Sequence, residues 1–387
     1  MKILHTSDWH LGHVLYNYDR TEEQAAMLLK MADIVREEKP DVFLLCGDVY
    51  HTSQPSAAVQ TMFANAVVKI HDANPTMPII ITAGNHDSSS KHEIFRVPWT
   101  ALHVYTIGSI PAERRDDLIV EIPGKGFVIA VPYVNERNLP EGLFQQLLDD
   151  VAERNTQGLP VIMTAHTTVS NCDYTGNDNA TGYTVGGIDY YDLEKMGTGY
   201  DYLALGHIHH AQFIKGSDHR ARYSGTPLPI SFDETFKHTV SIVEVDKHGG
   251  QPKVREIEIP IQRPLVTLPA RGAATWEEAK KLLADFPDDE EAYIRLNVEV
   301  EDFLPVEANN EAHMLTEKKK CRFCIINVQR KADRKNDIQT MSVQEFKTEH
   351  PIDIAKRYAK DMGIEFNDDM KELFEEALTD VNQESRQ

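Results

Sequence analysis

Short apolar runs alternate with longer amphipathic segments along the first two thirds of the chain. The runs KILHTS (2–7), DVFLLCG (41–47) and PIIITAG (78–84) have the length and apolar character of buried strands. Residues 21–38 and 56–73 instead repeat apolar positions at helical spacing, and Thr21 with Gln24 forms a capping-box pattern at the start of the first. Interleaved strands and helices of this kind predict an α/β fold with covered sheet faces.

The residues that follow five of the predicted strands are of one chemical kind. Each strand leads into an acid, an amide or an imidazole: Asp8 and His10; Asp48; Asn85, His86 and Asp87; His166; His207 and His209. Ligands of α/β sheets bind beyond the carboxyl ends of the strands, so these side chains are expected to meet at one rim. A single histidine at a strand end is ordinary, whereas five such ends together predict a metal site.

Three other histidines are expected away from the ligands. His5 lies inside a predicted strand, so we expect it in the core or behind the ligands. His13, in HLGH, is expected at the surface, and His210 faces away from His207 and His209 by strand alternation.

Composition narrows the class of protein. A chain of 387 residues with 41% hydrophobic residues predicts two or three folded domains. It has no apolar run long enough to span a membrane and no signal-peptide pattern at its start, so we expect a cytoplasmic protein. Four cysteines do not indicate a disulfide framework, and Cys321 and Cys324 have no second cysteine pair with which to bind zinc.

Charge is distributed unevenly. The net charge of −21 argues against a protein coated in positive charge. Residues 318–335 nevertheless hold eight basic residues against one acidic residue, while residues 336–387 hold thirteen acids and six bases. The basic stretch is either a phosphate-contacting cluster or a solvated charge run.

Several motifs resemble a known family. SDWHLG (7–12), GDVYHT (47–52), GNHDS (84–88), TAH (164–166) and ALGHIHHAQ (204–212) are similar to the metallophosphoesterase superfamily. RYSGTPLPISFDE (222–234) narrows the resemblance to the SbcD family of double-strand-break repair nucleases. The resemblance implies a β-sandwich nuclease domain flanked by helices (1–262), a small α+β capping domain that contacts DNA (263–335) and a C-terminal helical segment (336–387).

The resemblance also implies two divalent ions, usually Mn²⁺, and a role for each residue. Asp8, His10 and His209 would hold the first ion, Asn85, His166 and His207 the second, and Asp48 would bridge both. His86 would stabilise the transition state or protonate the leaving oxygen, and Asp87 would orient His86. His51 would contact the phosphate; some family members carry Asp there, so a loop histidine without a catalytic role stays open. Contacts with DNA would come from Lys318, Lys319, Lys320, Arg322, Arg330 and Lys331.

The implied activity is that of a DNA nuclease within a larger complex, cutting duplex ends as an exonuclease and hairpins or single strands as an endonuclease. Alternatives are a phosphoesterase acting on a small phosphodiester and a catalytically dead binding scaffold. The implied partners are DNA, an SbcC-type ATPase with a coiled coil, and a second copy of the chain within a heterotetramer.

Two apolar faces bear on those partners. Val59, Met62, Phe63 and Val67 lie on one face of a predicted helix, which either pairs with a second copy or packs on the sheet. The tail repeats apolar residues at helical spacing, including Met370 and Phe374, and either packs on the rest of the chain or docks on the ATPase.

Overall fold

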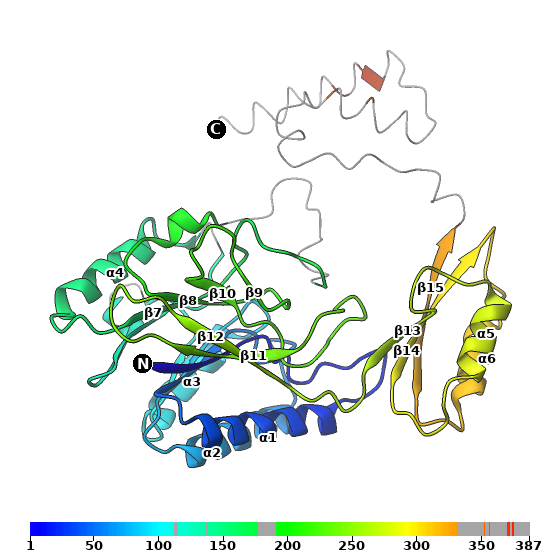
Figure 1. The fold of residues 1–387 in the computed structure, drawn as a ribbon, viewed down its shortest axis with the longest axis horizontal. Coiled ribbons are helices and arrows are strands. Elements are labelled where there is room, and N and C mark those ends of the chain that lie inside the picture. The colour runs from blue at the N-terminus through cyan, green and yellow to red at the C-terminus, as the bar shows by residue number, and fades with distance from the viewer. Residues whose placement is uncertain are drawn as a thin grey trace. The chain divides into compact units, whose positions relative to one another are not determined.

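The computed structural model describes residues 1–111, 115–135, 138–176 and 191–330, together with Ile352, Lys356, Met370, Lys371 and Phe374 (Figure 1). The chain divides into two compact units. Of the described residues, the first unit contains those within 1–267, 287–295 and 318–325, and the second contains residues 268–286, 296–317 and 326–330. The boundaries proposed from the sequence, after residues 262 and 335, stay predictions.

The first sheet carries the N-terminal strand near its middle. Its strand order is β12-β11-β1-β2-β3-β4. The bounds are Lys253–Glu258, Thr239–Glu244, Lys2–Thr6, Val42–Cys46, Ile79–Thr82 and Val104–Ile107. Strands β1 to β4 pair in parallel, and β11 runs antiparallel to β1. The parallel pairing brings the carboxyl ends of β1, β2 and β3 to the same edge.

The second sheet has the order β5-β6-β7-β8-β10-β9. Its bounds are Ile119–Ile122, Gly126–Ala130, Val161–His166, Tyr202–Gly206, Ala221–Tyr223 and Gln212–Phe213. Ile3, Val42 and Ile80 of the first sheet share one hydrophobic core with Val128 and Leu203 of the second. The sheets therefore pack face to face, and the α/β sandwich predicted from the sequence is confirmed.

Helices cover the outer faces of the sandwich. Those of the first unit are α1 (Thr21–Glu38), α2 (Ala57–Ala73), α3 (Ser89–Thr100) and α4 (Leu143–Arg154), with short 3₁₀ helices at Arg115–Leu118 and Leu193–Met196 (Figure 1). Phe63 and Val67 of α2 are buried in the core beneath the first sheet, and Val59 and Met62 pack on that core. The apolar face of α2 thus covers the sheet, which was one of the two interpretations of its sequence pattern.

The capping box predicted at Thr21 is wrong. Arg20 is the N-cap residue of α1, and it makes no side-chain capping bond. The Gln24 amide instead accepts a hydrogen bond from Gly12 N at 3.0 Å and donates one to His13 O at 3.3 Å. Gln24 therefore fixes the loop that follows His10. Its two bonds reach residues twelve and eleven positions earlier in the chain.

A smaller sheet has the order β13-β14-β15, with bounds Leu265–Leu268, Tyr293–Val300 and Arg322–Arg330. Helices α5 (Trp276–Ala284) and α6 (Ala308–Thr316) pack on each other, and Lys280 pairs with Glu311. A capping box of Thr275 and Glu278 begins α5. Cys321 and Cys324 are free thiols.

Two remaining expectations concern the membrane and the tail. Within the described residues, no helix has the length and apolar character needed to cross a bilayer. The predicted tail helices lie outside the described residues, apart from the five single positions. Docking of the tail on an ATPase therefore stays a prediction.

Candidate metal centre

Five strand ends deliver the polar side chains that the sequence singled out. Strands β1, β2 and β3 end beside one another in the first sheet, and β7 and β8 end beside one another in the second. Because the two sheets face each other, these ends enclose one cluster of buried acids and imidazoles. Two groups of potential metal-ligating side chains that include a carboxylate form there: a first of Asp8, His10 and His209, and a second of Asp48, His166 and His207. A third group consists of the imidazoles of His10, His51 and His86 alone.

The donor atoms of the two groups are closely spaced. His10 Nε2 lies 3.3 Å from His209 Nε2 in the first group. In the second, Asn85 Oδ1 lies 3.0 Å from both His166 Nε2 and His207 Nδ1. Two ligands held ~2.1 Å from one ion lie about 3.0–3.4 Å apart, so these spacings match the edges of a coordination shell.

Asp48 belongs to the second group and also faces a donor of the first. Its Oδ2 is 3.4 Å from His166 Nε2 and 3.7 Å from His10 Nε2. Its Oδ1 accepts a hydrogen bond from the backbone nitrogen of His86 at 2.9 Å. One carboxylate oxygen thus faces donors of both groups, as the predicted bridging role of Asp48 requires.

Hydrogen bonds behind the ligands set the orientation of two imidazoles. His209 Nδ1 donates to Glu234 Oε1 at 2.9 Å, and His166 Nδ1 donates to Cys46 O at 2.9 Å. A proton held at Nδ1 leaves the Nε2 lone pair directed into the cluster. Lone pairs and oxygens that converge in this way repel one another unless a proton or a cation lies between them, and a divalent cation removes that repulsion. The residues present therefore fit two metal ions.

Burial governs the electrostatics of the cluster. Burial lowers the pKa of His207 to about 3 and holds the pKa of His10 well below its ordinary value, so both rings are neutral and have a lone pair to offer a metal ion. Burial raises the pKa of Asp8. Burial also acts to lower the pKa of His166, but the Asp48 carboxylate outweighs it and raises that pKa to about 9. A cation bound beside Asp48 takes the place of the His166 proton.

Several ligands occupy backbone conformations that L-residues rarely adopt. Asp8, His10 and Asp48 have φ values of 54°, 44° and 50°, and His207 has 99°. Such conformations cost about 1–3 kcal/mol each and persist where neighbours enforce them. Asp8 N donates to Gly47 O and His10 N donates to Asp48 O, both at 3.0 Å. The loops after β1 and β2 thus hold one another in the strained form that directs these side chains inward.

Comparison with known proteins agrees with this geometry. A family model described as "Calcineurin-like phosphoesterase" matches residues 1–211. The SbcD component of the SbcCD nuclease of Bacillus subtilis (strain 168) is 30% identical over 99% of both chains. The chain belongs to the calcineurin-like phosphoesterase family and, within it, to the SbcD family. The SbcD proteins of Escherichia coli (strain K12) and Rhodobacter capsulatus are 30% and 29% identical, over 69% and 72% of this chain and 70% and 74% of theirs. Membership in the phosphoesterase family implies divalent metal ions.

Two glycines of this phosphoesterase allow the ligand loops to approach each other. A Cβ atom at Gly84 would overlap the Asp48 carboxylate and backbone nitrogen, and one at Gly206 would overlap Cys46 O. Neither residue needs an unusual φ, so close approach rather than turn geometry requires glycine here.

Replacing Gly84 with alanine is therefore expected to displace Asp48 and weaken metal binding. We expect at least a ten-fold loss of Mn²⁺ affinity, since even residues that only support ligands contribute about 10–100-fold. Equilibrium dialysis against Mn²⁺ checks this. Gly124→Ala is the control, because its Cβ would meet open space and its φ of 68° adds backbone strain without a clash. Unchanged affinity in Gly84→Ala would show that the Asp48 loop tolerates the extra atom.

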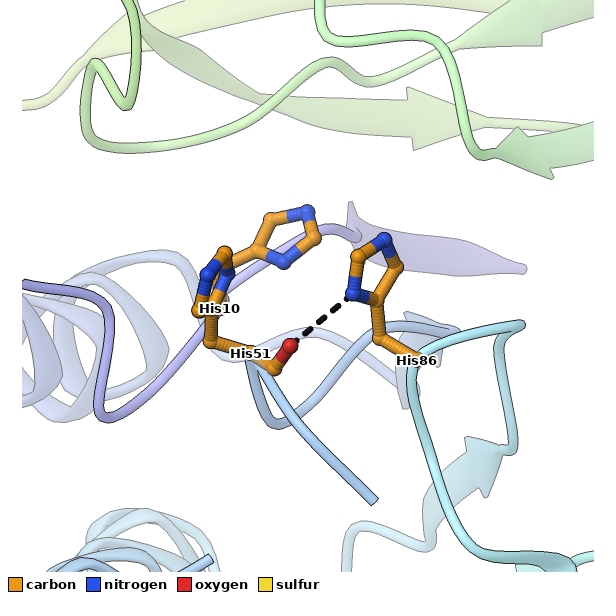
Figure 2. Close-up of side chains that lie close together, drawn as sticks. All are labelled: His10, His51 and His86. Atoms are coloured by element: carbon orange, nitrogen blue, oxygen red, sulfur yellow. Dashed lines mark hydrogen bonds between the residues drawn. The ribbon is translucent and has the colours of Figure 1, made fainter. Parts of the chain in front are cut away.

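Three imidazoles face one another beside the first group of ligands (Figure 2). The ring centroids of His86 and His10 are 5.0 Å apart, and His51 stacks on His86 at 5.7 Å. His86 Nδ1 donates to the backbone oxygen of His51 at 2.9 Å, the bond drawn dashed in Figure 2. The loops after β2 and β3 thus hold the two rings at the edge of the metal cluster.

Asp87 fastens those two loops together. Its carboxylate accepts hydrogen bonds from the backbone nitrogens of Val49, Tyr50 and Gly84, at 3.1, 3.0 and 2.9 Å. The atom that receives the His86 ring proton is the His51 carbonyl oxygen. Asp87 therefore holds the backbone on both sides of Asn85 and His86, and the role in orienting His86 that the resemblance implies for it stays a prediction.

Other histidines divide between core and surface. The prediction that His13 lies at the surface is wrong: its ring is buried and packs edge-on against His51 at 4.7 Å. Burial, with His51 and Arg20 nearby, lowers its pKa to about 3. His5 is a core residue that bonds the Tyr202 hydroxyl and Leu205 O. His210 stacks on Phe236 away from the ligands.

Two supporting residues escaped the sequence analysis. Glu234 has a fully buried side chain, orients His209 through Oε1 and accepts the Ile230 backbone nitrogen at Oε2. Thr226 Oγ1 donates to Asp8 O at 2.8 Å. Both lie in the RYSGTPLPISFDE segment, whose resemblance to the family was noted without a role for either residue.

The basic residues assigned to DNA have different environments. Lys318 and Lys320 are exposed, whereas Lys319 pairs with Asp288 at 2.6 Å. The Arg322 guanidinium lies over the Tyr18 and Tyr293 rings, 5.3 and 5.6 Å from their centroids. Arg330 is exposed, 5.9 Å from the Phe303 ring centroid, and Lys331 lies outside the described residues.

Proposed function

We propose that this chain is the metal-dependent nuclease of an SbcCD-type complex, hydrolysing phosphodiester bonds in DNA during repair, replication and recombination. The observation that carries the proposal is the pair of ligand groups joined by Asp48. The names of its relatives supply the substrate class. The complete ligand set opposes a catalytically dead scaffold.

Seven side chains would hold two divalent ions in this proposal. Asp8, His10 and His209 form the first site, Asn85, His166 and His207 form the second, and Asp48 bridges them. Oxygen and imidazole donors without a thiolate suit Mn²⁺. When bound, such ions supply a nucleophile at neutral pH and neutralise charge on the phosphoryl oxygens.

His86 and His51 would contact the substrate. Since the His86 Nδ1 proton is held by the His51 carbonyl, the general-acid role requires a second proton on Nε2. The doubly protonated ring would give that Nε2 proton to the leaving oxygen and return to its neutral form. Burial and the neighbouring His86 lower the pKa of His51, so a neutral His51 ring would contact the phosphate. His13, packed behind His51, limits the positions that this ring can take.

Duplex ends, hairpins and single strands are the proposed substrates, cut as exonuclease and endonuclease. Lys318, Lys320 and Arg330 are the exposed basic residues that support phosphate contacts. Lys319 pairs with Asp288 and Arg322 stacks on Tyr18 within the chain, so both are weaker candidates for DNA contacts.

Incubation with Mn²⁺ tests the activity. We expect labelled linear duplex DNA to be degraded and bis-p-nitrophenyl phosphate to be hydrolysed, both abolished by EDTA and restored by Mn²⁺. Hydrolysis of the small diester without cutting of any DNA would favour a small-molecule phosphoesterase. Inactivity on both would favour the scaffold.

A second copy of the chain is the proposed partner of helix α3. Ile94 and Val97 of α3 are 68% and 82% exposed, although both are large apolar side chains. We expect the wild-type chain to sediment as a dimer at micromolar concentration and Ile94→Asp with Val97→Asp to sediment as a monomer. Leu29→Asp, at an exposed position of α1, is the matched control. A monomeric wild type would contradict this interface.

The tail is proposed to dock on the coiled coil of an SbcC-type ATPase. A chain ending after Lys335 is expected to retain Mn²⁺-dependent hydrolysis of bis-p-nitrophenyl phosphate, because every proposed ligand precedes that point. It should lose co-purification with the ATPase and ATP-dependent cutting of duplex ends. A stable complex between the truncated chain and the ATPase would place the main dock elsewhere.

A further inference from the structure

Arg295 is joined to the first group of ligands by a short series of contacts within the first unit of the fold. It stands on β14, and each of its three guanidinium nitrogens donates to a different residue. Nη1 donates to Asp233 Oδ1 at 2.7 Å, Nη2 to Phe232 O at 3.4 Å and Nε to Thr267 Oγ1 at 3.2 Å. The guanidinium also lies 5.2 Å from the centroid of the Phe232 ring.

Phe232 and Asp233 directly precede the residue that orients a ligand. Glu234 accepts the His209 Nδ1 proton at 2.9 Å, and its side chain is fully buried. Phe232 is itself buried against Leu15 and Tyr293, so the backbone between the arginine contacts and Glu234 has little freedom. A shift of Phe232 and Asp233 therefore moves Glu234 and turns the His209 ring.

We infer that Arg295 is a positioning residue for the first metal site, acting on His209 through Phe232, Asp233 and Glu234. The inference rests on the proposed ligand role of His209. Glu234 is the intermediate link because its side chain accepts the His209 Nδ1 proton. Partners of metal-bound imidazoles contribute about 10–100-fold to metal affinity. Arg295 contacts the neighbours of Glu234 rather than the imidazole itself, so we expect its loss to reduce metal affinity by an amount near the lower end of that range.

Arg263 provides a matched control. Its guanidinium lies 5.5 Å from the centroid of the Tyr293 ring, and it pairs with Glu291 at 3.0 Å. Arg263 also approaches Glu23 at 3.8 Å, and its partners among the described residues lie outside the segment from Phe232 to Glu234. Substitution of Arg263 thus removes a similar cation and stacking contact but no hydrogen bond to the segment from Phe232 to Glu234. Because its stacking partner Tyr293 packs against Phe232, Arg263→Ala also controls for loosening of that cluster.

The experiment measures Mn²⁺ binding to the full chain by titration calorimetry. In Arg295→Ala we expect one of two Mn²⁺ ions to bind about ten-fold more weakly, with the other unchanged and with Arg263→Ala like wild type. Asp233→Asn changes the exposed partner of Arg295 in the ion pair and should weaken binding of the same Mn²⁺ ion. This variant provides the test if Arg295→Ala does not fold. Equal loss at both ions, or the same loss in Arg263→Ala, would mean general destabilisation and overturn the inference.

A double mutant tests the path. If Arg295 acts through Glu234, Arg295→Ala should add no further loss of affinity to Glu234→Ala. If the two losses of Mn²⁺ affinity add fully in the double mutant, Arg295 does not act through Glu234. His209→Ala separates this inference from the proposed function: if that variant still binds two ions, the ligand assignment fails. If His209→Ala loses one Mn²⁺ ion while Arg295→Ala and Asp233→Asn each bind two ions with wild-type affinity, only the proposed role of Arg295 fails.

Discussion

Replacing Asp48 with alanine is expected to abolish stable binding of both ions and, with it, hydrolysis of every phosphodiester substrate. Asp48 Oδ2 faces donors of both groups, at 3.4 Å from His166 Nε2 and 3.7 Å from His10 Nε2. Its Oδ1 also accepts a hydrogen bond from the backbone nitrogen of His86. Loss of the Asp48 carboxylate therefore loosens the loop that carries Asn85. Removing partners of ligands costs about 10–100-fold in affinity, and removal of a shared ligand is expected to exceed about 100-fold.

Metal analysis of purified Asp48→Ala, beside its turnover of bis-p-nitrophenyl phosphate, measures this effect. Asp33→Ala, at an exposed carboxylate on α1 that pairs with Arg36, is the control for loss of one negative charge. Two ions retained in Asp48→Ala at wild-type affinity would remove Asp48 from the bridging position.

Replacing His86 with alanine is expected to have the opposite pattern, with both ions retained and turnover greatly reduced. The His86 ring adjoins His10 and His51 but is oriented by a backbone carbonyl rather than by the ligand oxygens. A positioned general acid contributes about 10²–10⁴-fold to rate. We therefore expect a loss in that range for DNA cutting, with two Mn²⁺ ions still bound.

The size of the His86 effect should depend on the leaving group. p-Nitrophenolate leaves without a proton, whereas the sugar oxygen of DNA needs one, so hydrolysis of bis-p-nitrophenyl phosphate should suffer less than DNA cutting. Equal losses on both substrates would assign His86 to charge stabilisation instead of proton transfer. Fewer than two bound ions in His86→Ala would make it a ligand. His210→Ala is the control, because that ring stacks on Phe236 away from the cluster.

The sequence by itself determined the α/β class and the residue types at the carboxyl ends of five strands. These are local properties: apolar runs of strand length, and side chains whose positions after each strand are set by the backbone repeat. Parallel strands bring such ends to one edge, so Asp8, Asp48 and Asn85 were predictable as neighbours. The glycine before Asn85 was visible as well, although the reason for it, contact with Asp48, was not.

Only the tertiary structure decided how these side chains are held. His13 is buried against His51, and Gln24 bonds the loop after His10 instead of capping α1. Glu234 reaches His209 across 25 positions and Thr226 reaches Asp8 across 218. Such contacts join residues far apart in sequence, and no local spacing encodes which of many polar side chains will be enclosed together. Burial then fixes their protonation and orientation, because an enclosed polar atom must find its partner within the fold.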